Sequence, residues 1–279
     1  MSSNPLMKHF RRPAIYLKLP SRGKFWTDNS LDLPVTGDIP VYPMTSGDEI
    51  ALKTPDALMN GSSIVTVIQS CCPNIKDAWQ MPSIDVDATL IAIRIASYGT
   101  NMGVTTECPN CKTSGDYEIN LSNTLDNIRA PDYNVPVLYE QLKIKLRPQM
   151  YFTTTQVNIT NYEEQRIMQA LADTEISDEV RNAKLKESMD KIVAINDDLM
   201  VKSTEYIELE DGTKVTSSEY IGEFYKNAPS KVVKLIQEHT AKLAQEGALP
   251  LMQLTCDECH KDYTSNLEFD YASFFVTGS

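Results

Sequence analysis

The sequence predicts an α+β protein with a mostly helical core, an extended N-terminal arm, and a ribbon of two distant β-hairpins that carry four cysteines. Three features of the chain support this prediction. Two Cys-x-x-Cys pairs stand about half the chain apart, long stretches place apolar residues at helical spacing, and the first segment is rich in proline and glycine. With 279 residues, the chain is long enough to bury a core in one large domain or two small ones.

The chain is strongly acidic. Its 38 Asp and Glu residues outnumber its 26 Lys and Arg residues, and the formal net charge is −12. Such a surface repels phosphate backbones, so the composition argues against nucleic acid as a partner. The basic residues are scattered except for two small N-terminal groups, which are Lys8, Arg11 and Arg12, and Lys18, Arg22 and Lys24.

No stretch of the chain has the composition of a signal peptide or a membrane span. The most apolar run, residues 90–96, is too short to cross a bilayer and contains Arg94. We therefore expect a soluble protein that is made in a cytoplasm and does not bind a membrane. In that compartment the six cysteines are expected to be thiols or metal ligands before disulfides.

Residues 1–45 are predicted to form an extended docking arm. Prolines and glycines interrupt the segment, apolar and polar residues alternate only weakly, and Val35-Thr-Gly-Asp38 has the composition of a hairpin turn. Such an arm is more often a segment that docks on a partner than part of a core, because its apolar residues need a surface to lie on. These residues are Phe25, Trp26, Leu31 and Leu33.

Residues 46–102 are predicted to form four helices. Each has a start signal, or ends at a proline or glycine that stops the helix. The fourth is apolar nearly all round, which places it at the centre of the core. The expected helices are one that Thr45 caps with Asp48 and Glu49 in its first turn, a short one at residues 54–58 with Pro55 in its first turn, one over residues 61–72 that Pro73 ends, and one from Ser83 or Asp85 to Tyr98 that Gly99 ends.

Arg94 is a charged residue within the apolar run of the fourth helix. Two interpretations stay open. In the first, the side chain extends along the helix and keeps its charged end in solvent. In the second, it is buried in an ion pair with Asp48, Glu49 or Asp87, because a lone buried charge is too costly to keep.

The second half of the chain contains both helical and strand patterns. Alternating apolar residues predict strands, and caps or turn residues mark the ends of the helices. Residues 210–213 are expected to form a turn between two short strands. The predicted strands are residues 117–121, 142–146, 206–209 and 214–216, and the predicted helices are two segments within residues 153–206 that break near residues 173–177, one over residues 219–227 that Ser217 or Ser218 caps, and one from Pro229 to about Gln245 with Gly247 past its end.

The two cysteine pairs have the spacing of zinc ligands. They are Cys108-Pro-Asn-Cys111 and Cys256-Asp-Glu-Cys259, and each is expected to form a knuckle at the tip of a β-hairpin. Two thiolates from one tight turn reach adjacent positions around a tetrahedral ion, and a second turn supplies the other two. The prediction is a zinc ribbon with four cysteine ligands. Its Zn²⁺ is structural, since four thiolates leave no open position for water or substrate.

Other roles for these cysteines stay open. A redox dithiol would need a thioredoxin-like βαβ context, which the pattern lacks. Cys256 to His260 also match a haem-attachment pattern, but that chemistry needs export. The thiols could also be unmetallated or joined as disulfides, and His260 could replace a cysteine as ligand, although a residue directly after a knuckle more often lies outside the ligand set. Cys71 and Cys72 are expected to be small core residues.

Joining the two knuckles ties the middle of the chain to its end. The predicted organisation has three parts: the arm at residues 1–45, a helical core with the zinc ribbon at residues 46–111 and 251–279, and an inserted, mainly helical subdomain at residues 112–250. Such an insert is tolerated because loop-closure entropy grows only slowly with length.

No catalytic motif is found in the chain. The Gly-x-x-x-x-Gly-Lys-Ser/Thr, Gly-x-Ser-x-Gly, His-Glu-x-x-His and Gly-x-Gly-x-x-Gly patterns are all missing. Asp85 and Asp87 are a close acidic pair, but at the start of a helix they suit the helix dipole better than acid–base chemistry. None of the three histidines, His9, His239 and His260, has a convincing partner in sequence. We therefore expect no catalytic residues and no enzyme.

Several short blocks follow one another in a specific order. They are residues 19–26 (Leu-Pro-Ser-Arg-Gly-Lys-Phe-Trp), 40–45 (Pro-Val-Tyr-Pro-Met-Thr), 48–50, 53–58, 60–61, 67–73 (Val-Ile-Gln-Ser-Cys-Cys-Pro), 90–99 (Leu-Ile-Ala-Ile-Arg-Ile-Ala-Ser-Tyr-Gly) and 108–111 (Cys-Pro-Asn-Cys). This set resembles the base plate protein family of T4-like contractile-tailed phages, the small baseplate hub assembly proteins. The resemblance is densest over residues 17–111 and weaker over residues 140–151.

The resemblance implies a non-enzymatic phage tail protein, a structural or assembly component of the baseplate hub. The implied partners are the tape measure protein and the hub and spike proteins, with a homo-oligomer in the hub as a further possibility. The implied location is the host cytoplasm during assembly and the tail baseplate of the virion.

An alternative function rests on the cysteine pairs alone. A zinc ribbon is also found in adaptor proteins that bind nucleic acid or a transcription complex. Such a ribbon is expected to carry Lys and Arg on its knuckles, whereas Asp257, Glu258 and Asp262 crowd the second knuckle.

Overall fold

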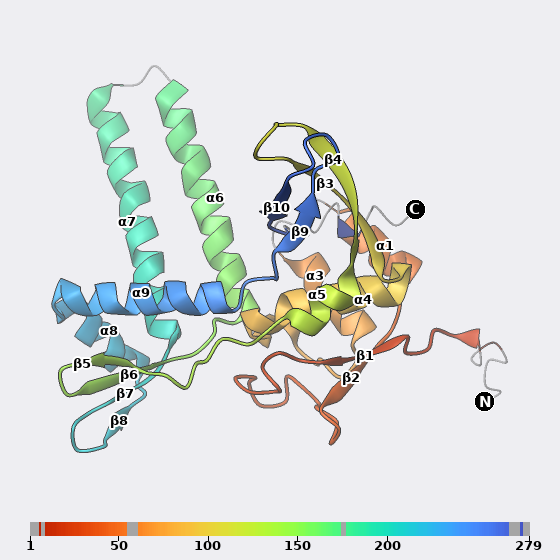
Figure 1. Cartoon of the computed structure of the whole chain (residues 1–279). Helices are drawn as coiled ribbons and strands as arrows, with labels where there is room; N and C mark the ends of the chain where they lie inside the picture. The colour runs from red at the N-terminus through yellow and green to blue at the C-terminus, as the bar shows by residue number, and fades with distance from the viewer. Residues whose placement is uncertain (1–5, 7–8, 55–60, 174–176, 268–273, 276–279) are drawn as a thin grey trace. The chain divides into compact units, whose positions relative to one another are not determined.

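The computed structural model describes residues 6, 9–54, 61–173, 177–267 and 274–275 (Figure 1). The chain divides into two compact units, which are described separately. Unit 1 comprises residues 1–130 and 247–279, and unit 2 comprises residues 131–246. Both contain helices and small antiparallel sheets, so the predicted α+β class is confirmed. The helix predicted at residues 54–58 lies, from residue 55 on, outside the described residues.

Unit 1 is built around helix α4, Ser83–Tyr98. Every residue from Asp85 to Ile95 except Asp87 is buried, as expected for a helix that is apolar nearly all round. Gly99 follows in the left-handed region with φ 89° and ends the helix as predicted. The other helices of unit 1 are α1 (Ser46–Leu52), α3 (Ser62–Cys71), the short 3-10 helix η2 (Ala78–Gln80) and α5 (Leu121–Asn127).

The predicted start of α1 is confirmed by its cap. The Thr45 hydroxyl accepts a hydrogen bond from the N–H of Asp48 at 3.3 Å, and the Asp48 carboxylate accepts one from the N–H of Thr45 at 2.7 Å. These two bonds form a capping box, which satisfies N–H groups that the first turn of a helix leaves unpaired.

The segment predicted as a docking arm is packed inward. Strand β1 (Ile15–Lys18) pairs antiparallel with β2 (Asp38–Val41), and both strands contact α4. Residues 35–37 form a turn before β2, and Gly37 there has a φ of 78°. The hairpin predicted around residues 35–38 is wrong, because β2 pairs with β1 and not with a strand directly before the turn. This segment therefore packs against α4 of its own unit. Its buried apolar side chains are Leu17, Leu19, Ile39 and Val41, each at most 2% exposed.

Asp85 is a fully buried carboxylate that fixes the loop after β1. It accepts hydrogen bonds from the Ser21 N–H at 2.7 Å, the Ser21 hydroxyl at 2.5 Å and the Trp26 indole N–H at 2.9 Å. Burial raises the pKa of Asp85 to about 6, against the lowering effect of the bonds from Ser21 and Trp26. From the sequence, Asp85 is expected to interact with the helix dipole. The structure shows that it also holds the loop containing Ser21 and Trp26.

Arg94 is 2% exposed, so the interpretation that it reaches solvent is wrong. Its guanidinium donates a hydrogen bond to the Phe274 carbonyl oxygen at 2.8 Å and lies 5.4 Å from the ring centroids of both Tyr98 and Phe274. Asp48, one of its predicted partners, pairs instead with Arg11 at 3.4 Å. Arg94 therefore joins α4 to the C-terminal segment.

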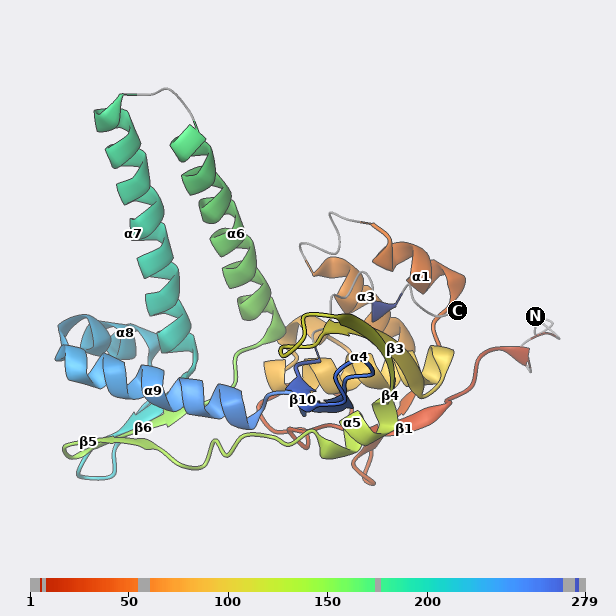
Figure 2. The same cartoon turned by 45° about the horizontal axis from the view of Figure 1, so that its top comes forward.

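Two antiparallel hairpins carry the cysteine pairs, as predicted. Strand β3 (Asn101–Glu107) pairs with β4 (Ser114–Asn120), and β9 (Met252–Thr255) pairs with β10 (Asp262–Ser265). The two hairpins lie side by side in both views of unit 1 (Figures 1 and 2). The first one follows directly from α4, so the core helix sets its position.

The strand predicted at residues 117–121 ends one residue earlier. Leu121 is fully buried as the first residue of α5. The Asn120 side chain accepts hydrogen bonds from the N–H groups of Ser122 and Asn123 and so caps this helix. Alternation alone does not distinguish a buried strand end from a buried helix start.

The described residues of unit 2 form a four-stranded antiparallel sheet, in the order β5-β6-β7-β8, and four helices. The central strands pair with Ile144 opposite Ile207, and both residues lie in one apolar cluster with Ile221 of α8 and Ile236 of α9. The predicted Ser217 cap of α8 and the turn at residues 210–213 are confirmed. The elements are β5 (Val137–Tyr139), β6 (Leu142–Leu146), β7 (Thr204–Glu208), β8 (Lys214–Val215), α8 (Ser218–Asn227) and α9 (Ser230–Glu246).

Helices α6 (Tyr151–Asp173) and α7 (Asp178–Lys202) of unit 2 form an antiparallel pair, with the predicted break between them (Figure 1). Glu164 is 4% exposed and pairs across the two helices with Lys191 at 3.3 Å. These are the longest helices in the described residues, and neither they nor any other described helix is long and apolar enough to span a membrane.

We predict that Asp85→Asn removes a pH-dependent part of the stability. The folded-state pKa of about 6 lies above the usual 3.8, so the folded protein holds this proton more tightly than the unfolded chain. The stabilisation is full below about pH 4 and is lost as the pH rises through about 6. The pKa difference corresponds to about 3 kcal/mol.

Urea unfolding of both proteins between about pH 4 and pH 7 measures this effect. The free energy of unfolding of the wild type, relative to that of the variant, should fall across the range. A constant difference would show that the folded-state pKa of Asp85 is ordinary.

Candidate metal centre

The sulfur atoms of Cys108, Cys111, Cys256 and Cys259 converge on one point, all within 4.8 Å of one another. The Sγ atoms of Cys108 and Cys259 are 3.8 Å apart, and those of Cys111 and Cys256 are 3.5 Å apart. A disulfide would bring two sulfurs to about 2.05 Å. Four sulfurs at about 2.3 Å from a tetrahedral ion are about 3.8 Å from one another. The cluster therefore has the size of a four-thiolate metal site.

The two knuckles have the same backbone geometry. In each, the residue directly after the second cysteine has a positive φ and donates its N–H to the carbonyl oxygen of the first cysteine. The N–H of the first cysteine donates in turn to the backbone carbonyl oxygen two residues after the second cysteine. This tight turn directs both thiols of a pair to the same side. The bonds are Lys112 to Cys108 at 2.9 Å and Cys108 to Thr113 at 3.0 Å in the first knuckle, and His260 to Cys256 at 2.9 Å and Cys256 to Lys261 at 3.0 Å in the second.

The hairpins have little other support. In β3 and β4, exposed and half-buried residues alternate and none is buried, and Leu254 is buried in β9 whereas β10 has no buried residue. A two-stranded hairpin without a buried face is marginally stable. In the described residues the contacts between the hairpins besides the cysteines include the hydroxyls of Thr106 and Ser265 at 3.1 Å, the Lys261 ammonium and the Asn110 side-chain oxygen at 2.9 Å, and the rings of Tyr117 and Tyr263 at 6.2 Å.

The thiols of the cluster differ in acidity. Hydrogen bonds from the side chain and backbone of Thr113 lower the pKa of Cys111 to about 6. The Cys259 N–H acts to lower the pKa of Cys256, but burial and the neighbouring Cys111 and Cys259 thiols outweigh it and raise that pKa to about 11. Four thiolates at this separation repel one another strongly, and a divalent cation is the partner that removes that repulsion.

The remaining cysteines and His260 lie outside the cluster. Cys71, the last residue of α3, and Cys72, which follows it, are fully buried, and burial raises the pKa of Cys71 to about 12 and that of Cys72 further. Both are core residues, as predicted. In the described part of the chain, the four cysteines are the one group of three or more side chains placed to share a metal ion.

Sequence reasoning missed two residues that shape the cluster. Thr113 acts on the acidity of Cys111, and Asn110 accepts the hydrogen bond from Lys261. Thr113 accepts the Cys108 N–H through its backbone carbonyl oxygen, which any residue offers, so this bond gave no sequence signal for its effect on Cys111. The bond between Asn110 and Lys261 joins two knuckles that are distant in sequence, and no local pattern indicates it.

A family model described as T4 bacteriophage base plate protein matches residues 15–276. The match runs from β1 to beyond β10 and includes all of unit 2. The chain therefore belongs to the T4 bacteriophage base plate protein family, which confirms the resemblance found in its sequence. Neither a curated protein nor a solved structure gives a significant match. Membership implies a component of the phage tail that interacts with other tail proteins.

We predict that the purified protein binds about one divalent metal ion per chain, and that Co²⁺ in its place gives the thiolate-to-metal absorption of a four-sulfur tetrahedral site. Cys111→Ser should abolish the absorption band and most of the bound metal, because it removes one of the four thiolates. Cys71→Ala is the matched control, since it removes a buried thiol outside the cluster. Metal analysis and absorption spectra under reducing conditions measure both, and a Cys111→Ser protein with full metal content would contradict the assignment.

Proposed function

We propose that this chain is a non-enzymatic structural or assembly component of the base plate hub in a contractile phage tail. The observation that carries the proposal is the family match, which extends over residues 15–276 and so includes both units and both hairpins. The assignment concerns the chain as a whole and does not depend on one domain.

The four cysteines are proposed to bind a structural Zn²⁺. Sulfur ligands in a tetrahedral arrangement suit zinc, and the separations of 3.5 and 3.8 Å agree with it. Because four thiolates fill the coordination sphere, the ion would hold the two hairpins together and would not activate water or substrate. The site then acts as a clasp between residue 108 and residue 259.

The proposed partners are the tape measure protein and the hub and spike proteins, and a homo-oligomer within the hub is a further possibility. The binding surfaces are proposed to lie on the exposed parts of residues 1–45 and on the segment at residues 112–250, which contains unit 2. Several large apolar side chains of unit 2 are exposed, as a protein that assembles with others requires. They include Phe152, Tyr162, Ile167, Met189 and Val193.

Nucleic-acid binding is the less favoured function. Asp257, Glu258 and Asp262 surround the second knuckle, and the net charge of the chain is −12. A ribbon that binds a phosphate backbone would present basic residues there. A filter-binding assay with duplex DNA tests this alternative, and salt-dependent affinity would favour it over the base plate role.

We predict that Cys256→Ser prevents tail assembly when it replaces the wild-type protein in infected cells. The variant loses one sulfur of the clasp, so the hairpins should separate and the surfaces they support should be lost. Complementation of a phage lacking the gene measures this, with Cys71→Ala as the control that retains assembly. Normal tail assembly with the Cys256→Ser protein would show that the four-cysteine site is not needed for the function.

Mass spectrometry of purified tails and of assembly intermediates tests the location. The protein should be present in the base plate hub fraction, together with tape measure and hub proteins. Its presence in neither fraction would contradict the proposed function.

A further inference from the structure

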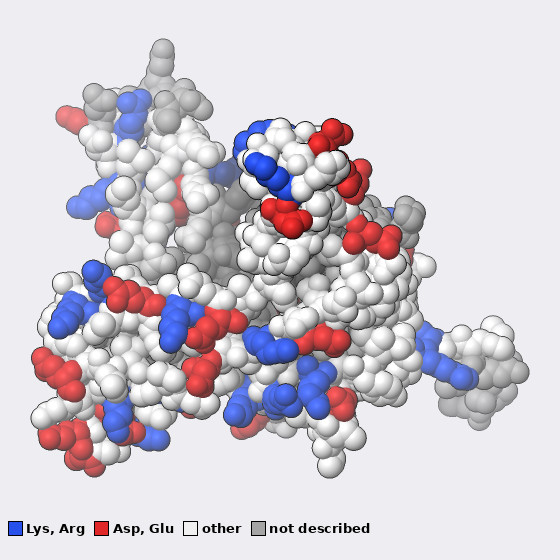
Figure 3. Space-filling model, in the orientation of Figure 1, with Lys and Arg blue, Asp and Glu red and all other residues white. Residues whose placement is uncertain are grey.

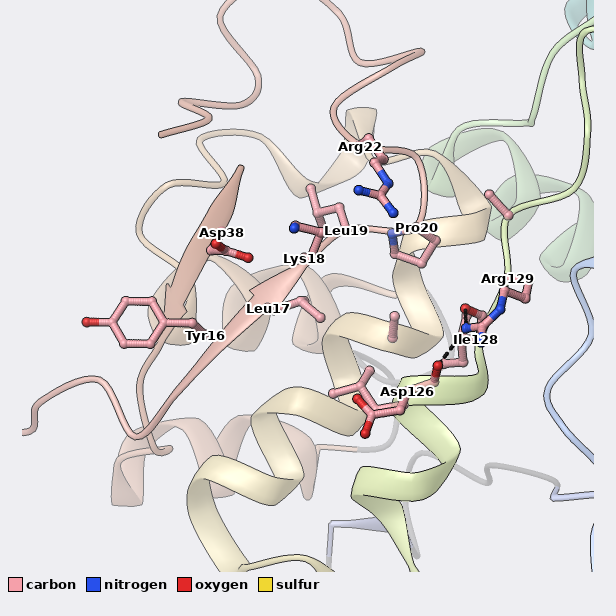
Figure 4. A pocket seen from close by; sticks show the side chains of 13 residues that line it. Tyr16, Leu17, Lys18, Leu19, Pro20, Arg22, Asp38, Asp126, Ile128 and Arg129 are labelled. Carbon is pink, nitrogen blue, oxygen red and sulfur yellow. Dashed lines mark hydrogen bonds between the residues drawn. The ribbon is translucent and has the colours of Figure 1, made fainter. Parts of the chain in front are cut away.

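Unit 1 contains a hollow of about 480 Å³ between β1, the loop after it and the residues that follow α5 (Figure 4). The apolar part of its lining, which forms the floor, comes from Pro20, Leu125 and Ile128, which are half-buried, above the buried Leu17, Leu19 and Ala88. Polar side chains surround this floor. The hollow therefore offers an apolar bottom within a charged rim.

Three cations line the hollow, from separate parts of the chain. They are Lys18 at the end of β1, Arg22 in the next loop and Arg129 after α5, and all three are exposed. Among the described residues none of the three forms an ion pair. Arg129 donates hydrogen bonds to two backbone carbonyl oxygens, those of Asp126 and Ile128. In Figure 3, Lys and Arg side chains gather below α5 on this part of unit 1. Such a grouping stands out in a chain with a net charge of −12.

The loop that carries Arg22 is held in a fixed and uncommon conformation. Arg22 has a φ of 55°, in the left-handed region that L residues rarely adopt, and Gly23 follows with a φ of 77°. The buried Asp85 anchors this loop through Ser21 and Trp26. The core therefore imposes the backbone conformation that places the Arg22 guanidinium beside the hollow (Figure 4).

The rest of the rim indicates which ligand fits. Tyr16 is 69% exposed at the edge, and Asp38 and Asp126 also line the hollow. Exposed Tyr and Arg around an apolar floor are the residues that dominate protein–protein hot spots. The two carboxylates repel a polyphosphate or a nucleic acid. A peptide can present carboxylates to Arg22 and Arg129, an N–H or ammonium to the carboxylates, and an apolar side chain to the floor.

We propose that this hollow is the docking site for an acidic peptide segment of another tail protein, one that carries an apolar side chain between its carboxylates. The site rests on the proposed base plate function, since it takes its partner from the tail. The lining of the hollow specifies the charge and the apolar side chain of the segment that this chain recognises.

The test uses full-length protein and labelled overlapping peptides tiled across the other tail proteins of the same phage. Fluorescence anisotropy should select acidic peptides that contain an apolar residue, and Arg22→Glu and Arg129→Glu should each weaken the binding at least about tenfold. Lys53→Glu is the matched control, because it makes the same charge change at an exposed position outside the hollow, and it should bind as the wild type does.

Arg22→Gly separates recognition from folding. Glycine adopts a φ of 55° without strain, so the variant should keep the thermal midpoint of the wild type and still lose the binding. Unchanged peptide binding in Arg22→Glu and Arg22→Gly overturns the site. Inorganic phosphate or a short DNA duplex that binds the hollow as tightly as the best peptide overturns the choice of ligand.

Incorporation of the wild-type and Arg22→Glu proteins into purified tails is measured in a separate experiment. If wild-type protein is found in purified tails and Arg22→Glu is incorporated equally well, the docking site is wrong and the base plate function stands. If the wild type is not found in tails but binds acidic peptides through Arg22, the hollow is a peptide site and the proposed function is wrong.

Discussion

The sulfur atoms of four cysteines lie within 4.8 Å of one another. They come from two hairpins that are separated by about half of the chain. Unit 2, residues 131–246, lies in the chain between these two hairpins of unit 1. The strands of these hairpins bury almost no side chains, and the contacts between the hairpins other than the cysteines are few. In the described strands hydrophobic burial is small, and we propose that a metal ion bound by the four cysteines holds β9 and β10 beside β3 and β4.

The rest of unit 1 depends on two buried charges of α4. Asp85 near its start collects three hydrogen bonds from the loop after β1, and Arg94 near its end binds the carbonyl oxygen of Phe274. A buried charge is tolerated only with polar partners, so each one fixes the segment that satisfies it. One central helix thereby contacts the loop after β1 and Phe274 and leads directly into the first hairpin. The hollow beside Arg22 is a consequence of the first of these restraints.

The sequence predicts the elements whose signals are local. The caps at Thr45 and Ser217 and the four-cysteine cluster follow from short patterns, and the structure agrees with each. It does not predict how residues 15–41 pack, because strands of four residues with alternating burial give too weak a pattern. The partner of Arg94 is 180 residues away, and Leu121 changes from strand to helix through a cap at Asn120. These features arise from tertiary contacts, which a local pattern does not contain.

A metal ion bound by the four cysteines is proposed to hold the two hairpins of unit 1 together. Hydrogen–deuterium exchange of the full-length protein, metal-loaded and metal-stripped under reducing conditions, tests it directly. On metal removal, amide protection should be lost in β3, β4, β9 and β10 and retained in the apolar cluster of unit 2. Equal protection of the four strands with and without metal would contradict the account.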